Sequence, residues 1–416
     1  MAGEKWNSGA LGDIAEIKTG KLDSNAATWG GRFPFFTCSP ETLTIDTAAF
    51  DCEAAILAGN NASGVFSVKY FHGQFNAYQR TYVISSRDSN ALETKYLYYQ
   101  LQQLKDLLGE YSIGTATKFL TRRILDPLPI PLPPLAEQKT IAAVLGALDD
   151  KVELNRRMNA TLEAMARALF QSWFVDFDPV RAKLDGRPPA NLDPATAALF
   201  PKHLEDSPLG HIPNGWEART IESVCKTVTR GVTPEYGEGT GRFIINQRVN
   251  RGPDLDWSSL KELSQGLEVP PERFARRWDV LVNCLGEGTL GRTHLYKGES
   301  DLYAIDQHMS ICRAEHRSGG AYIYQVLSGA DGQARIESLK TGSTGMTMFN
   351  ISKLRTFEMV WPPAEILAAY FKAVEPLWLQ VANNDHQSRT LATLRDKLLP
   401  KLLSGELSVA EAASLV

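Results

Sequence analysis

The chain has 416 residues, of which 43% are hydrophobic, and this is enough material for two or three domains with cores of their own. No run approaches the ~20 apolar residues of a membrane-spanning helix, and the amino terminus lacks a signal-peptide pattern. The net charge of −4 at pH 7 excludes a uniformly basic nucleic-acid-binding protein, although recognition needs only a local positive face.

Residues 1–132 are predicted to form an α+β domain. Strand-like runs at 33–36, 54–57, 64–70 and 78–84 alternate with turns rich in Gly, Asn and Ser. A helix is predicted from Leu92 to Leu108, because leucines recur on one face and Gly109 follows as a stop signal. The basic, hydroxyl-rich segment 111–123 comes next and contains no acidic residue. It is either a solvated surface turn or a contact for a polyanion.

Two long helices are predicted, and the second is a copy of the first. Each follows a proline pair, at 133 or 362, and similar strings lie downstream at 161 and 390, so both landmarks are 229 residues apart. Apolar residues recur at three- and four-residue intervals as far as Leu169 and Leu398, which predicts an amphipathic helix of ~50 Å in each of the segments 133–178 and 362–416. Asn155 and Asn384 fall at the same seam position, where a buried Asn fixes register. We expect a coiled-coil pair, with two ordinary core helices as the alternative.

The part of the chain between the helices is predicted to contain a connector and a second domain. The connector, 179–208, is rich in Pro and Ala, and the aromatic residues just before it, in 170–177, either pack on a domain or dock a partner. Residues 209–361 resemble the first domain, because the run 77–84 matches 304–311 and Gly114 matches Gly342. The predicted fold is therefore α+β, with two similar domains separated by a pair of long antiparallel coiled-coil helices and internal pseudo-twofold symmetry.

The sequence contains no recognisable catalytic motif. The glycine-rich segment 286–291 matches a dinucleotide fingerprint, but a strand-like run follows it where a helix is required, so we interpret it as a hairpin turn. Glu93 and Lys95 have a nuclease-like spacing, yet Glu93 is expected near a helix start. The chain has neither a GxxxxGK[ST] loop nor an Asn-Pro-Pro-Tyr tetrad, and its five cysteines show no CxxC spacing. We expect a non-catalytic cytoplasmic protein that binds no metal or cofactor.

Four features together resemble a known family. They are Leu135-Ala136-Glu137-Gln138 after a proline pair, the string 170–178, the segment from Gly210 to Trp216, and Gly342-Ser343-Thr344 ahead of the second proline pair. In this order they resemble the specificity subunit of type I restriction-modification systems, over essentially the whole chain. One departure is that the second helix begins Ala364-Glu365-Ile366-Leu367 and so lacks the Glu-Gln pair, which puts equal partner contacts by the two helices in doubt.

The resemblance implies a function in DNA recognition. Two target-recognition domains would each read half of a split double-stranded DNA site, and the helices would set the spacing and bind two methyltransferase (modification) subunits. Restriction subunits, which combine a translocase and a nuclease, would join the complex. S-adenosylmethionine, ATP and magnesium are expected in these partners. A DNA-modifying enzyme with an unrecognised active site and a coiled-coil scaffold without DNA specificity are the alternatives.

The candidate DNA-binding residues are polar or basic and lie in expected loops or strand ends. Arg, Gln and Asn suit contacts to guanine and adenine edges, whereas Lys118, Arg122 and Arg123 are interpreted as phosphate contacts. His308 is interpreted as either a groove contact or a core hydrogen-bonding residue. The full set is Thr37, Ser39, Asn60, Asn61, Gln79, Arg80, Thr115, Thr117, Lys118, Arg122, Arg123, Arg242, Gln247, Arg248, Asn250, Arg251, Gln307, His308, Ser343 and Thr344.

Overall fold

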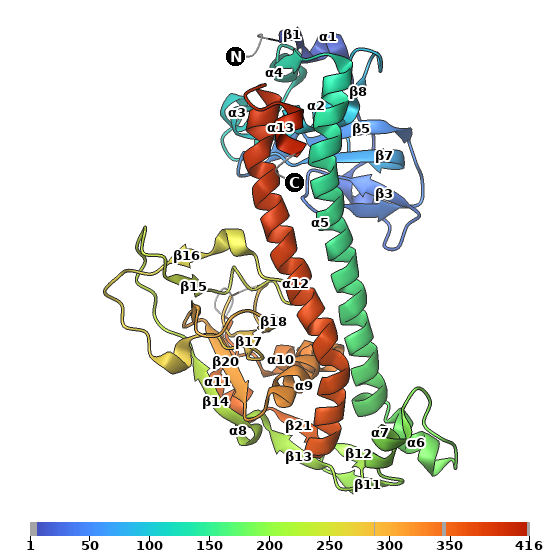
Figure 1. Cartoon of the computed structure of the whole chain (residues 1–416), viewed down its shortest axis with the longest axis vertical. Helices are drawn as coiled ribbons and strands as arrows, with labels where there is room; N and C mark the ends of the chain where they lie inside the picture. Colours follow the sequence, from blue (N-terminus) through green and yellow to red (C-terminus); the bar gives the residue numbers. More distant parts are fainter. Residues whose placement is uncertain (1–5, 287, 343–346, 414–416) are drawn as a thin grey trace. The chain divides into compact units, whose positions relative to one another are not determined.

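A computed structural model describes residues 6–286, 288–342 and 347–413 of the chain (Figure 1). The chain divides into two compact units, Met1–Asn155 with His386–Val416, and Arg156–Asp385. Each unit contains one mixed α+β domain and part of each of two long helices, α5 (Leu135–Phe170) and α12 (Ala364–Leu403). Within the described ranges, no helix has the length and apolar character needed to cross a membrane.

The first unit is built on a six-stranded sheet. Its strands are antiparallel neighbours except for β3 and β7, which are parallel. The central strand β5 is apolar on both faces, because Ala55 and Leu57 pack under a helix while Ala54 and Ile56 pack in a second cluster on the other face. The order is β2 (Ala15–Thr19), β8 (Thr81–Ser86), β5 (Phe50–Ala58), β7 (Val68–Ala77), β3 (Phe33–Phe36) and β4 (Leu43–Ile45).

The helix predicted over 92–108 is two helices, α2 (Thr94–Gln103) and α3 (Lys105–Tyr111), which meet at Leu104. The prediction that Gly109 stops the helix is wrong, since Gly109 lies inside α3. A side chain at Gly109 would place its Cβ 3.0 Å from the carbonyl oxygen of Gly64. Gly109 therefore serves a close approach of two backbones rather than a helix end.

The second unit contains two smaller sheets. The antiparallel four-stranded sheet has the order β14 (Cys225–Arg230), β20 (Met309–Ala314), β17 (Val280–Asn283) and β18 (Thr293–Leu295). The other sheet has the order β16 (Lys261–Glu262), β15 (Phe243–Ile245) and β19 (Tyr303–Ile305), with β15 parallel to β19. Helices α9 (Arg317–Ser328) and α10 (Ala330–Leu339) follow. The segment from Gly286 to Gly291 joins β17 to the antiparallel β18, which confirms a turn there.

Short elements frame each domain in the same order. In the first unit they are β1 (Asn7–Ala10), α1 (Leu11–Ile14), β6 (Asn60–Asn61), β9 (Lys118–Phe119), α4 (Arg122–Leu125) and β10 (Pro129–Leu132). In the second they are β13 (Glu217–Thr220), α8 (Ile221–Val224), α11 (Ile351–Arg355) and β21 (Glu358–Trp361). The pairs β1 with β10 and β13 with β21 are antiparallel and correspond residue by residue.

The two domains repeat the same backbone hydrogen bonds. The amide of Gly59 donates to the carbonyl of Arg80 (2.8 Å), and that of Cys284 donates to the carbonyl of His308 (2.8 Å). Ala77 pairs with the last residue of β3, as Ile305 pairs with the last residue of β15. Ala77 therefore corresponds to Ile305, one residue later than the sequence comparison placed it. The shift matters because successive side chains of a strand point to opposite faces of the sheet, so an error of one residue assigns every side chain of the run to the wrong face.

The long helices run antiparallel within each unit. In the first, Asp149 accepts from Arg395 (2.6 Å) and Asn155 donates to Gln387 (2.9 Å). In the second, Asn159 donates to Asp385 (2.6 Å) and the carbonyl of Ala166 accepts from the hydroxyl of Tyr370 (3.5 Å). Partner numbers rise along α12 as they fall along α5, as an antiparallel pair requires.

The helix seam holds several bonded polar side chains rather than a single asparagine pair. Asn155 and Asn384 are both buried, as predicted. Asn155 donates to Gln387 and Ser388, and Asn384 donates to Asn159 (2.8 Å). The predicted helical segments were also too long, because α5 is followed by a π-helical turn (Gln171–Val175), and α12 by α13 (Val409–Ala413).

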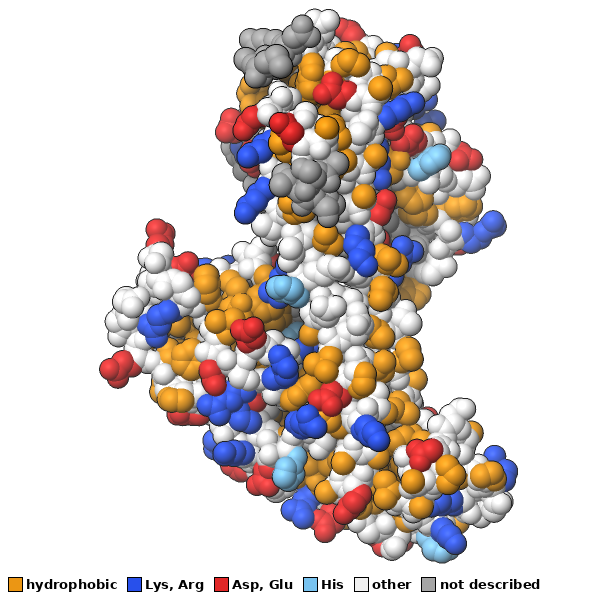
Figure 2. All heavy atoms as spheres, in the orientation of Figure 1, with side chains coloured by type: hydrophobic (Ala, Val, Ile, Leu, Met, Phe, Trp, Pro, Cys, Tyr) orange, Lys and Arg blue, Asp and Glu red, His pale blue; other side chains and the backbone are white. Residues whose placement is uncertain are grey.

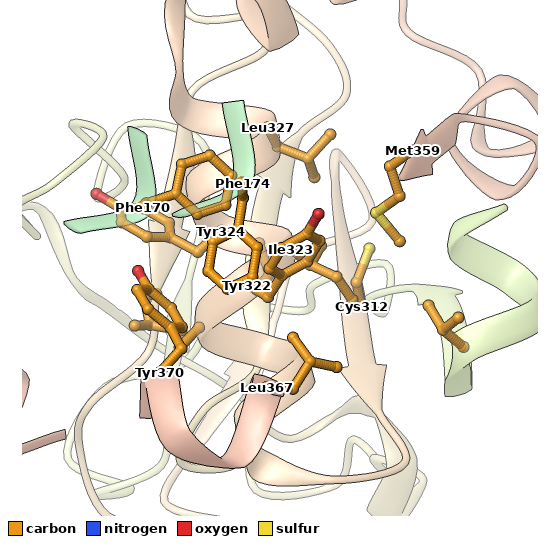
Figure 3. Packing of buried hydrophobic residues seen from close by; sticks show 14 of the residues in the cluster. Phe170, Phe174, Cys312, Tyr322, Ile323, Tyr324, Leu327, Met359, Leu367 and Tyr370 are labelled. Carbon is orange, nitrogen blue, oxygen red and sulfur yellow. The ribbon is translucent and has the colours of Figure 1, made fainter. Parts of the chain in front are cut away.

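The aromatic residues at the end of α5 pack inside the second unit (Figure 3). Phe174 makes edge-to-face contacts with Tyr322 and Tyr370, each with ring centroids 5.0 Å apart. Trp173 contacts Phe200 in the same manner. The packing interpretation of 170–177 is therefore confirmed. The connector is partly ordered into α6 (Asp178–Leu184), α7 (Pro194–Leu199) and the hairpin of β11 (Leu204–Ser207) and β12 (Gly210–Pro213).

Gln138 and its counterpart Leu367 make different contacts at the start of the long helices: Gln138 forms hydrogen bonds, and Leu367 packs in an apolar cluster. The buried Gln138 side chain accepts from the amide of Glu93 (2.9 Å) and donates to the carbonyls of Ala91 and Pro133. Leu367 is buried in the apolar cluster of the second unit. The absence of the Glu-Gln pair from the second helix thus corresponds to a difference in internal packing.

Replacing Gln138 with leucine is expected to lower the free energy of unfolding by about 1–3 kcal/mol, because buried backbone groups lose their hydrogen-bond partners. The exposed neighbour Lys139 provides the control, since Lys139→Ala should change it by less than about 0.5 kcal/mol. Urea unfolding followed by circular dichroism measures both. Equal midpoints for the two variants would show that Gln138 does not hold α2 to α5.

Candidate nucleic-acid interface

In the first unit, four segments of the chain meet at the end of β5. Gly59 donates to the carbonyl of Arg80, and Leu120 donates to the carbonyl of Gly59 (2.9 Å). Strand β6 pairs with β9, so Asn61 lies opposite Lys118. The thiol of Cys38 contacts the carbonyl of Arg80 and brings the turn after β3 to the same place. We call these segments, 37–39, 59–61, 78–80 and 117–120, the first site.

The first site presents basic and amide side chains to solvent. The Arg80 side chain is exposed and its guanidinium carbon lies 5.6 Å from the centre of the Phe119 ring. Gln79 is exposed, and its amide nitrogen donates to Asp23 (3.3 Å). Lys69 braces the adjacent loop by donating to the carbonyls of Ser39 and Glu41, and burial lowers the pKa of its ammonium group. The site combines a stacked guanidinium, an oriented amide and a half-buried lysine, Lys118.

The second unit forms the same backbone arrangement, which we call the second site, from segments 246–248, 284–286, 306–308 and 347–349. Phe349 donates to the carbonyl of Cys284, as Leu120 does to Gly59. Its side chains differ from those of the first site. Gln307 accepts from the hydroxyl of Thr233 (2.9 Å), and His308 lies 2.9 Å from the buried carboxylate of Asp306.

Equivalent turns carry the side chains that follow β3 and β15. The hydroxyl of Thr37 accepts from the amide of Ser39 (3.2 Å), and the amide oxygen of Asn246 accepts from the amide of Arg248 (2.8 Å). Such side-chain caps fix the turn locally. Ser39 and Arg248 therefore occupy the same position in the two sites, and so do Arg80 and His308.

The comparisons with known proteins agree with this repeated architecture. Residues 3–164 match the family model "Type I restriction modification DNA specificity domain". The EcoDI specificity subunit of Escherichia coli is 32% identical over 237 residues, which span 55% of this chain and 51% of that relative. The MjaIX specificity subunit of Methanocaldococcus jannaschii is 23% identical over 98% of this chain and 94% of its own length.

The chain is thus similar to type I restriction-modification specificity subunits over up to 98% of its length, and the DNA specificity domain of the family model matches its residues 3–164. The crystal structure of the S subunit from M. genitalium has the same fold, with a TM-score of 0.58 at 15% identity, covering 95% of this chain and 96% of that one. The α+β class predicted from the sequence is thereby confirmed.

Three of the predicted DNA-binding residues make hydrogen bonds within the fold. Asn250 is fully buried, donating to Asn283 and to the carbonyl of Arg292 and accepting from the amide of Gly252. Arg242 donates from both terminal nitrogens to carbonyls of the loop 264–267. Thr37 is buried as the turn cap described above. The prediction for Asn250 is wrong, because this side chain is fully buried and bonded inside the protein. Thr37 and Arg242 are bonded within the fold, and their contacts with DNA stay predictions.

The remaining predicted residues differ in exposure and in the partners that they already have. Arg122 is exposed but pairs with Asp126 (2.7 Å), and Arg251 pairs with Asp256 (3.0 Å). Hydrogen bonds from Ser258, Arg251 and Ser259 lower the pKa of Asp256 to about 2. Thr115 and Arg123 are exposed, Thr117 is half-buried, and Gln247 is half-buried near Gly286. Ser343 and Thr344 lie outside the described residues.

Several residues that border the two sites were not predicted from the sequence. Asp23 and Thr233 hold the two glutamines, and Lys261 lies over the half-exposed ring of Tyr236 (4.6 Å). Asp23 and Thr233 are 210 residues apart, the same offset that relates β1 to β13. The 210-residue offset could therefore have identified Asp23 and Thr233 as an equivalent pair from the sequence. Figure 2 shows basic and acidic side chains interspersed on the face in view, in keeping with the net charge of −4.

Proposed function

We propose that this chain is the DNA-recognition subunit of a type I restriction-modification complex, and that each domain reads one half of a bipartite, asymmetric target. The observation that carries the proposal is the repeat of one backbone site with different side chains at equivalent positions. Equal backbones can approach DNA in the same manner. Different side chains, such as Arg80 against His308 and Ser39 against Arg248, would then select different bases.

Within each site the side chains suggest a division of labour. Arg80 and Arg248 are exposed and can donate two parallel hydrogen bonds to a guanine edge. Lys118 suits a phosphate oxygen, which would position the domain without selecting sequence. Asn60, Asn61, Thr115, Thr117, Arg122, Arg123, Gln247 and Arg251 remain candidate contacts around these two groups.

The chemistry of restriction and modification is assigned to partners. The long helices would bind two methyltransferase subunits, and restriction subunits would join them. S-adenosylmethionine, ATP and magnesium would be held by those subunits. The first domain (1–132), the second domain (209–361), and the helices with their connector would be the working parts of this chain.

The test is selection of bound duplexes from a random library by the full chain, followed by sequencing. Two conserved clusters of bases with a constant gap are expected. Enrichment of a single uninterrupted cluster would contradict the bipartite proposal. A library that remains random after selection would favour the scaffold alternative, which has no DNA specificity.

The Lys118→Ala variant is expected to weaken binding to all duplexes alike and to reduce the slope of log K against log salt by about 0.9, because one phosphate contact is lost. Lys202→Ala, at an exposed position in the connector, is the charge-matched control and should leave the slope unchanged. Fluorescence anisotropy between about 50 and 200 mM salt measures both. A change of base preference in Lys118→Ala would contradict a pure phosphate contact.

A further inference from the structure

Gln79 and Gln307 occupy equivalent and rigid positions at the two sites. The amide of Gln79 donates to the carbonyl of Leu22 (2.9 Å), and that of Gln307 donates to the carbonyl of Val232 (2.8 Å). Just before these partners lie Gly20 and Gly231, where an added Cβ would come within 1.7 Å and 1.9 Å of the carbonyl oxygens of Ala77 and Ile305. Only glycine permits this contact, which holds each glutamine backbone against the end of a strand.

The glutamine side chains are held from opposite ends of the amide. In the first site, the nitrogen of the Gln79 amide donates to the Asp23 carboxylate (3.3 Å). In the second site, the oxygen of the Gln307 amide accepts from the Thr233 hydroxyl (2.9 Å). Asp23 and Thr233 are equivalent residues, since each directly follows the bridge partner of the glutamine segment, Leu22 with Tyr78 and Val232 with Asp306.

The hydrogen bond that each glutamine makes in the structure leaves different groups of its amide available to a ligand. An ionised carboxylate only accepts hydrogen bonds, so Asp23 binds the amide nitrogen and leaves the carbonyl oxygen and one N–H of Gln79 without a partner in the described part of the chain. The Thr233 hydroxyl uses the carbonyl oxygen of Gln307 and leaves the two N–H groups. The first site thus presents an acceptor beside a donor, and the second presents donors.

We infer that Gln79 and Gln307 read the base at equivalent places in the two half-sites, and that Asp23 and Thr233 are positioning residues that set the base each glutamine prefers. This inference rests on the proposed function. An acceptor beside a donor matches N6 and N7 of adenine in the major groove, whereas donors match N7 and O6 of guanine. Gln79 therefore selects adenine in the first half-site, and Gln307 selects guanine in the second.

The test uses the full chain and the duplex obtained by selection from the random library. In Asp23→Asn the amide of Gln79 can reverse, since asparagine both donates and accepts. Adenine preference at one position of the first half-site should fall by about 5- to 150-fold, and the second half-site should not change. Thr233→Val should remove the preference at one position of the second half-site only.

A matched control exists in the same domain. Asp51 accepts from Gln74 (3.1 Å) in an exposed cross-strand pair with the same chemistry. Asp51→Asn should leave every base preference unchanged. The salt dependence should also stay unchanged in all of these variants, because none of them removes a phosphate contact.

Placing the positioning residue of the first site in the second site tests the base assignment more directly than removing it. Thr233→Asp should shift the preference in the second half-site from guanine to adenine. Replacing the selected adenine by 7-deazaadenine, which lacks the N7 acceptor, should weaken binding by the wild-type chain but not by Gln79→Ala.

Failure of the proposed function and failure of the positioning role would give different results. If the wild-type chain selects no sequence, the proposed function itself is wrong. If it selects a split sequence and both Asp23→Asn and Thr233→Val keep the original base preferences, only the positioning role is overturned. A selected target without adenine in one half and guanine in the other would overturn the base assignment.

Discussion

Asp279→Ala is expected to lower the free energy of unfolding of the second unit by about 3–5 kcal/mol, the cost of leaving a buried charge without its partner. The side chains of Asp279 and Arg313 are only 2% and 12% exposed. Two hydrogen bonds join them, at 2.9 Å and 2.7 Å, and Asp279 also accepts from the amide of Arg276. Thermal unfolding followed by differential scanning calorimetry measures the loss.

The effect of Asp279→Ala should reach the second site as well. Arg313 lies in β20, which begins at Met309 directly after His308. Selection from the random library should therefore show weaker base preferences in the second half-site and unchanged preferences in the first. The equivalent positions in the first unit are Ala54 and Ser85, an apolar and a small polar residue, so that unit has no matching ion pair.

The control for this prediction replaces both members of the pair. Asp279→Leu combined with Arg313→Met should restore most of the stability, since well-packed apolar residues often substitute for a buried ion pair without loss. A double variant as unstable as the single one would show that packing around Asp279, rather than an unpaired charge, causes the loss.

The large features of this fold were accessible to sequence reasoning because they rest on repetition. Two offsets, 229 residues for the helices and 210 for the domain starts, appear both in the sequence and in the pairing of β1 with β10 and β13 with β21. The helix stripes and the turn at 286–291 follow from local periodicity, which needs no tertiary information.

Other features could not be read from local sequence. Asn250 resembles a surface residue in composition, and only its contact with Asn283, 33 residues away, shows that it closes a buried turn. Gln79 and Asp23 are 56 residues apart, so the orientation of the Gln79 amide depends on tertiary structure. The one-residue shift between 77–84 and 305–312 needed the hydrogen bonds at Gly59 and Cys284. Loops that carry recognition are defined by such distant contacts.

The boundary between the two compact units suggests where the spacing of the target can be altered. It crosses α5 between Asn155 and Arg156 and α12 between Asp385 and His386. Insertions at these two points would leave intact the bonds from Asn155 to Gln387 and from Asn159 to Asp385, because each bond lies within one unit. The proposed role of the helices in setting the spacer can therefore be tested without disturbing either domain.

Insertion of four helix-forming residues at both points is expected to lengthen the gap between the half-sites by one or two base pairs while their sequences stay the same. Four residues add about 6 Å and rotate the helix by about 40° beyond one turn, and 6 Å is nearly two steps of ~3.4 Å along B-DNA. Selection from the random library measures the gap. The same insertion in α5 alone is the control, because it breaks the seam and should destabilise the chain rather than produce a new spacer. A folded double-insertion variant that keeps the original gap would show that the helices serve partner binding and do not set the spacing.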